Sequence, residues 1–134
     1  MATKRIDNSL PEHQEQCFLI EWFDLQAMAR GYNPSLLFAI PNGGKRDAIV
    51  GKRMKDEGVR RGIPDLFLAI PTDNFHGLFI ELKRTNGARA SKFQKEMIEE
   101  LSQWGYPAVV CHGWIEARDA ICDYLGWDKE KNRL

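Results

Sequence analysis

The pattern that most constrains the fold is a pair of apolar runs joined by a short polar segment. The runs are PDLFLAIP (64–71) and LFIELKR (78–84), and TDNFHG lies between them. Both runs are rich in the aliphatic and aromatic residues that favour β-strands, and the polar segment is a good turn. The pattern therefore predicts an antiparallel hairpin, in which the start of the first strand lies beside the end of the second.

The segments around this hairpin alternate between helical and strand patterns. Helices are expected over 12–30, 47–59, 92–104 and 114–126, and further strands over 35–41 and 106–112. This order of elements predicts an α/β fold in which helices flank a mixed β-sheet.

Two of the helices begin with capping signals. Ser9, followed three residues later by Glu12, has the pattern of a capping box, and Ser91 is a good N-cap for the helix over 92–104. In that later helix, apolar residues recur at helical spacing. The buried stripe expected from them is Phe93, Met97, Leu101 and Trp104.

The composition is that of one ordinary soluble domain. The 134 residues are 43% hydrophobic and 28% charged, and we expect a core over about 9–126 with a short charged tail over 127–134. No apolar run approaches the ~20 residues that span a bilayer, and the N-terminus lacks the apolar core of a secretory signal. We therefore expect no membrane partner and a cytoplasmic location. Cys17, Cys111 and Cys122 form no closely spaced pair and are expected to be small core residues.

The net charge of zero conceals a strong asymmetry. From Lys45 to Lys95 the chain carries twelve Lys or Arg residues against six Asp or Glu residues, so the remainder of the chain is acidic to the same extent. A basic central segment favours binding to a polyanion, although a solvated surface with many salt bridges would have the same composition.

Three ionisable residues of the predicted hairpin are expected to meet. Alternate residues of a strand share a face, so Glu81 and Lys83 point the same way, and the turn brings Asp65 to them. Two carboxylates suit a hard cation such as Mg²⁺ or Mn²⁺, and a lysine beside them can orient or deprotonate an attacking water. Together these residues predict phosphodiester cleavage. Taken singly, Asp65 could be a turn residue, and Glu81 and Lys83 a solvent-facing pair.

The motifs also resemble a known family. GIPDLFLAI followed by GLFIELKR is similar to the PD-(D/E)xK nuclease superfamily. With EHQEQ, PNGGKR, GVRRGIPD and SKFQ in the same order, the chain resembles the VRR-NUC (virus-type replication-repair nuclease) family over about residues 12–124. The resemblance implies a restriction-endonuclease-like core with a mixed sheet.

The resemblance assigns roles at individual positions. It implies that Asp65 and Glu81 are metal-binding carboxylates, that the backbone carbonyl of Leu82 is a further ligand, and that Lys83 is the catalytic lysine. Gln94 is similar to a family glutamine beside the site, although it could also be an ordinary exposed helix residue.

The family also has a glutamate of the first helix near the metal, and this chain offers Glu12 and Glu15. Glu12 is already expected in the capping box with Ser9. Glu15 shares a helical face with Leu19 and Trp22 and should point inward, so Glu15 is predicted to be the ligand.

Backbone amides and basic side chains of the central segment are the expected contacts to nucleic acid phosphates. These residues are Asn42, Gly43, Gly44, Lys45, Arg46, Lys52, Arg53, Arg60, Arg61 and Arg84, with Arg89 and Lys92 as further candidates.

The function implied is that of a Mg²⁺- or Mn²⁺-dependent DNA endonuclease. Stand-alone domains of this family, often encoded by phages, resemble Holliday-junction resolvases that act as homodimers on four-way junctions. The alternatives are a restriction-like or flap-cutting nuclease of the same fold, or a catalytically silent DNA-binding module.

Overall fold

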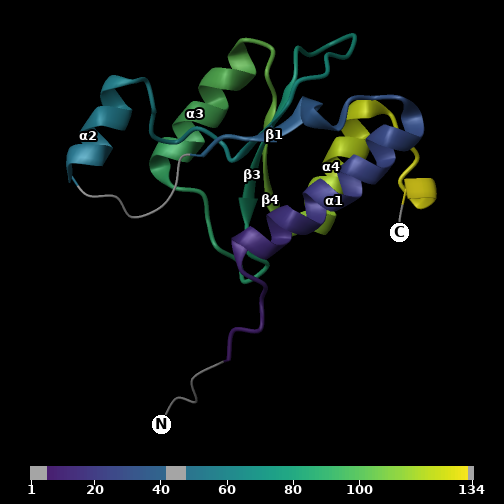
Figure 1. Cartoon of the computed structure of the whole chain (residues 1–134), viewed down its shortest axis with the longest axis horizontal. Helices are drawn as coiled ribbons and strands as arrows, with labels where there is room; N and C mark the ends of the chain where they lie inside the picture. The colour runs from purple at the N-terminus through teal and green to yellow at the C-terminus, as the bar shows by residue number, and fades with distance from the viewer. Residues whose placement is uncertain (1–5, 42–47, 133–134) are drawn as a thin grey trace.

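A four-stranded mixed sheet forms the centre of the computed structural model, which describes residues 6–41 and 48–132 (Figure 1). The strands lie in the order β1 (Leu37–Ala39), β2 (Leu66–Leu68), β3 (Leu78–Lys83) and β4 (Ala108–His112). β2 pairs antiparallel with both β1 and β3, whereas β3 and β4 are parallel. The predicted hairpin and the predicted mixed sheet are therefore confirmed.

Helices lie on both sides of this sheet, with α1 and α4 together on one side and α3 on the other (Figure 1). The helices are α1 (Glu12–Arg30), α2 (Ala48–Asp56), α3 (Lys92–Gln103) and α4 (Trp114–Leu125), with short 3-10 turns η1 (Pro34–Leu36) and η2 (Glu130–Asn132). α2 buries no residue and stands apart from the sheet. No helix among the described residues is both long and apolar enough to cross a membrane.

The aliphatic core fills the space between the sheet and the α1–α4 pair. Leu78, Ile80 and Leu82 of β3 are buried there, together with Leu19 and Phe23 of α1. Burying a side chain of this size contributes roughly 1.5–3 kcal/mol. Cys111 and Cys122 also belong to this core, as predicted, and burial raises the pKa of the Cys111 thiol to about 12. The prediction is wrong for Cys17, which is only partly buried and lies outside the core.

The opposite face of the sheet is lined by aromatic and charged side chains. Phe38, Phe67 and Phe79 follow one another across β1, β2 and β3, with ring centroids 5.7 and 4.4 Å apart. Further along β3 the same face carries Glu81 and Lys83. The predicted alternation along β3 is confirmed, since its aliphatic residues are all buried on the other face.

The start of α1 differs from the prediction. Its N-cap is Pro11, with no side-chain capping hydrogen bond, and the backbone amide of Ser9 donates to Asp7 Oδ1 at 2.9 Å. The expected capping box between Ser9 and Glu12 is therefore wrong. A proline lacks the backbone N–H group and has a restricted φ, so it marks this helix start without a side-chain cap. Glu12 remains exposed and free for another role.

The start of α3 matches its prediction, but its buried face does not. Ser91 and Gln94 form a complete capping box. Of the predicted stripe, however, Met97 and Leu101 are only half-buried, whereas Phe93 and Trp104 are 49% and 69% exposed. The prediction of a buried stripe is wrong at both ends of the helix, because α3 packs on the sheet chiefly through its middle.

Candidate active site

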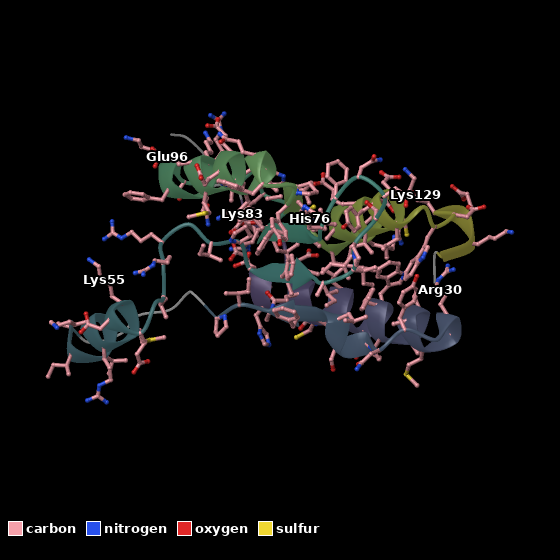
Figure 2. All side chains as sticks on the ribbon, turned by 90° about the horizontal axis from the view of Figure 1, so that it is seen from above. Arg30, Lys55, His76, Lys83, Glu96 and Lys129 are labelled. Carbon is pink, nitrogen blue, oxygen red and sulfur yellow. The ribbon has the colours of Figure 1, made fainter. Side chains whose placement is uncertain are left out.

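Asp65, Glu81 and Lys83 line one surface cavity of about 450 Å³. The antiparallel register of β2 and β3 brings two of these residues together. Leu66 pairs with Ile80, so the preceding Asp65 lies next to Glu81. Figure 2 shows Lys83 near the middle of the molecule, between the sheet and α3, while Lys55 of α2 lies far to one side. The three residues that the hairpin was expected to bring together do lie together.

Asp65 is fastened to the neighbouring strand. Its Oδ2 accepts a hydrogen bond of 2.8 Å from the backbone amide of Leu82, whose side chain is in the core. A hydrogen bond from a backbone amide fixes the carboxylate in one orientation. The ligand role expected for the Leu82 carbonyl stays a prediction.

Glu81 is a buried carboxylate that lacks a full set of partners. Its side chain is only 3% exposed, and Oε1 accepts from Gln94 Nε2 at 2.8 Å and lies 3.4 Å from Lys83 Nζ. Oε2 is buried and has no hydrogen-bond partner among the described residues. A buried, unpartnered carboxylate oxygen is unfavourable unless a cation or a proton balances it.

The surroundings of Glu81 change its affinity for a proton. Burial and, next, the neighbouring Asp65 carboxylate raise the pKa of Glu81 to about 7, while Lys83 acts in the opposite direction. Lys83 alone therefore does not balance the two acids. An oxygen-rich, electron-donating pair of this kind fits a hard divalent cation.

Gln94 connects the start of α3 to this carboxylate. Its Oε1 accepts from the backbone amide of Ser91 at 2.8 Å, while its Nε2 donates to Glu81 Oε1. Both ends of the amide are used, so Gln94 holds Glu81 in a fixed position. The expected place of Gln94 beside the acids is confirmed by this contact, and its role in catalysis stays a prediction.

The two glutamates of α1 lie in different environments. Glu15 is 4% exposed and points inward, as expected, but its Oε2 accepts from the backbone amide of Trp114 at 2.7 Å. This bond satisfies a free N–H group at the start of α4. Glu12 instead lines the cavity that contains Asp65 and Glu81.

The structure thus brings Glu12 to the acids and places Glu15 at the start of α4. Across residues 6–41 and 48–132, no three His, Cys, Asp or Glu side chains are grouped closely enough to hold a metal ion. Asp65 and Glu81 are therefore the two acids of the site, with Glu12 at its rim. The sequence carries no local signal that separates the two glutamates, because proline is tolerated in the first turn of a helix and so does not exclude a capping role for Glu12.

The basic residues predicted to contact nucleic acid fall into distinct groups. Arg60 and Arg61 are exposed and line the cavity itself. Lys52 and Arg53 are exposed on the outlying α2, where Lys52 pairs with Asp56 at 2.9 Å. The predicted contacts at 42–46 lie outside the described residues.

Arg84 has a structural task that the sequence did not indicate. Its guanidinium donates to the backbone carbonyls of Ser9 at 2.8 Å and Leu10 at 3.1 Å, and lies 3.3 Å from Asp7 Oδ2. These contacts fasten the segment before α1 to the end of β3. The charge of Arg84 also helps to lower the pKa of Asp7 to about 2, after hydrogen bonds from Ser9 and Asn86.

Comparisons with known proteins agree with the geometry. A sequence profile of the VRR-NUC domain matches residues 6–114. The solved structure of a protein described as a VRR_NUC domain protein is similar, with a TM-score of 0.76 and 30% sequence identity, over 90% of this chain and 94% of that one. No curated protein matches the sequence.

Proposed function

This chain belongs to the VRR-NUC domain family and is therefore a nuclease, and we propose that it is a Mg²⁺- or Mn²⁺-dependent, structure-specific DNA endonuclease. The observation that carries the proposal is the buried Glu81 carboxylate, whose Oε2 has no described partner, beside Asp65 and Lys83 in one cavity. Such an arrangement is unfavourable for stability alone, which supports a role in binding a cation and a phosphate.

Asp65 and Glu81 would hold the cation, with the Leu82 carbonyl as a further candidate ligand and Glu12 at the cavity rim, where it would contact a metal-bound water. When bound there, a divalent cation lowers the pKa of a coordinated water and neutralises charge on the phosphate. We propose Glu12 rather than Glu15 for the contact at the cavity rim, because of the two only Glu12 lines the cavity.

The side chains of the protein perform the remaining tasks. Lys83 Nζ, 3.4 Å from Glu81 Oε1, would orient the attacking water, and would take its proton once the amine has lost its own proton to solvent. Gln94 keeps Glu81 in position. Arg60 and Arg61 at the cavity edge would hold the backbone phosphates of the DNA.

We propose further that the substrate is a four-way (Holliday) junction and that the enzyme acts as a homodimer. A two-fold axis would place two equivalent sites on a two-fold symmetric junction. Trp22 is in the core and Trp104 is 69% exposed, so of these two helix tryptophans only the latter is free for a contact between subunits. The expected setting is the cytoplasm, including that of a phage-infected cell.

A panel of labelled DNA substrates tests this function. The proposal expects cleavage of a four-way junction in Mg²⁺ or Mn²⁺, less cleavage of flap and linear duplex, and none with a chelator. Preferential cleavage of flaps or duplex would favour the alternative nucleases. Binding without cleavage in either metal would indicate a silent DNA-binding module, and sedimentation of the protein with and without junction would test the homodimer.

A further inference from the structure

An exposed aromatic side chain stands at the edge of the candidate active site. Phe93, in the first turn of α3, is 49% exposed and lines the cavity that holds Asp65, Glu81 and Lys83. Most other residues of this cavity are charged or polar. The exposed part of an apolar ring among such groups is available to a flat, apolar ligand.

Phe93 is held firmly although it is exposed. The guanidinium of Arg61 lies over its ring, 5.0 Å from the centroid. Beside it, Gly62 has a φ of +78°, and a Cβ at this position would be 2.4 Å from the Phe93 carbonyl oxygen. The backbone of the 60–63 loop therefore packs directly on the first turn of α3, in a way that only glycine permits. The ring and the guanidinium form a preorganised pair.

We propose that Phe93 stacks on a base exposed at the branch point or flap next to the scissile phosphate, while Arg61 binds a neighbouring phosphate. This inference rests on the proposed nuclease function and deepens it. Every base has a flat π-face, so an aromatic side chain binds unpaired nucleotides with little dependence on sequence. The cation–π contact holds Arg61 on the cavity side, where a backbone phosphate would lie.

The pair would select DNA by its structure. In intact duplex the bases are stacked on one another, and exposing one requires unstacking energy. In a flap a base is already unpaired, and the base pairs at the branch point of a junction are open on the side facing the crossover, so Phe93 contacts a base there at a lower cost. Phe93 is therefore a specificity-determining residue, and its loss should lower the preference for branched DNA.

A comparison of protein and substrate changes tests the stacking directly. Phe93→Ala and Phe93→Leu should each cleave the preferred branched DNA about tenfold more slowly, whereas Phe93→Trp retains the rate. Cleavage of intact duplex changes little. Phe75→Ala is the matched control, because it removes an exposed aromatic residue from the turn between β2 and β3, outside the cavity. It should leave both rates unchanged.

Abasic nucleotides placed in turn on each side of the cleavage point identify the stacked base. At one position the abasic change should slow the parent enzyme as much as Phe93→Ala does, and should not slow Phe93→Ala further. Effects that multiply at every position would overturn the inference, as would equal slowing of branched and duplex DNA by Phe93→Leu. In either case the parent still cleaves, so the nuclease proposal stands. A parent that cleaves no DNA contradicts both proposals.

Discussion

The two faces of β3 show how differently neighbouring residues of one strand can be used. Leu78, Ile80 and Leu82 point to α1 and α4 and are fully buried in aliphatic surroundings. Glu81 and Lys83 point to the other side, form an ion pair and line an open cavity. The first face stabilises the fold. The second face contains the buried Glu81 carboxylate, which does not stabilise the fold. Its unpartnered oxygen is therefore available to bind a cation.

The same contrast appears between the helices on the two sides. α1 and α4 bury several residues each, whereas α2 and α3 bury none. Packing on the α3 side is less complete, which leaves room for a cavity and for exposed residues such as Phe93. Stability and activity should therefore respond separately to changes on the two faces.

The largest expected effect is on catalysis. Lys83→Ala should reduce cleavage by about a thousandfold, because a positioned proton-transfer group contributes effects of this order. Its free energy of unfolding is measured in parallel and cleavage is compared for the folded fraction, because the substitution also removes the ion pair with the buried Glu81. The control is Lys95→Ala, an exposed lysine of α3 outside the cavity, and cleavage rates are measured on the same labelled junction. A Lys83→Ala enzyme that cuts at the rate of the control would remove the assigned role.

The opposite face predicts a stability effect instead. Ile80 is 0% exposed, and Ile80→Ala should lower the free energy of unfolding by about 3 kcal/mol, since it deletes buried methyl groups and leaves a cavity. Urea denaturation followed by circular dichroism measures the change. The fraction that is folded should still cleave DNA. A destabilisation below about 1 kcal/mol would mean that this face is not the main core.

The two glutamates of α1 allow a second comparison between stability and activity. Glu15 contacts the start of α4, whereas Glu12 lines the cavity. Glu15→Ala leaves the Trp114 amide without its partner and should cost about 2 kcal/mol of unfolding free energy. Glu12→Ala should change stability little and should lower cleavage and Mn²⁺ affinity. Urea denaturation and metal titration separate the two. If Glu15→Ala, when fully folded, fails to bind Mn²⁺ while Glu12→Ala binds it normally, the original expectation of Glu15 as the ligand is right.

A smaller effect concerns pH. Because the pKa of Glu81 is raised from 4.5 to about 7, the folded protein keeps a proton that the unfolded chain loses between these values. The folded state binds more protons there, so this group makes the free energy of unfolding fall as pH rises through that window. Glu81→Gln has no such proton and should gain stability relative to the parent as the pH rises.

Urea denaturation in chelator at about pH 5 and about pH 7.5 measures this difference. Glu15→Gln is the control, since its carboxylate lies at the start of α4 and outside the cavity. A stability difference between Glu81→Gln and the parent that is the same at both pH values would contradict the raised pKa.

Strand periodicity alone predicts most of the candidate site. Alternation put Glu81 with Lys83, and the hairpin turn brought Asp65 to them, because both follow from local geometry that the residues themselves dictate. Ser91 was likewise recognisable as a cap, since capping depends on neighbours three residues away.

The remaining features depend on contacts between distant segments. Glu12 and Glu15 are one helical turn apart, and only the approach of α4 decides that Glu15 meets Trp114. Arg84 binds backbone carbonyls from the segment before α1, which lies more than seventy residues earlier, and no local pattern indicates this task. Its expected contact to DNA stays a prediction. The stripe of α3 was overestimated because periodicity shows which residues share a face, and does not show how much of that face the sheet covers.

The central claim is that Asp65, Glu81 and Lys83 form a metal-dependent nuclease site. Its most direct test is cleavage of a labelled four-way junction in Mn²⁺ by the parent and by Glu81→Gln, which keeps the shape of the side chain and removes its charge. The account predicts that the parent cuts and that folded Glu81→Gln does not. Equal cleavage by both proteins would contradict it.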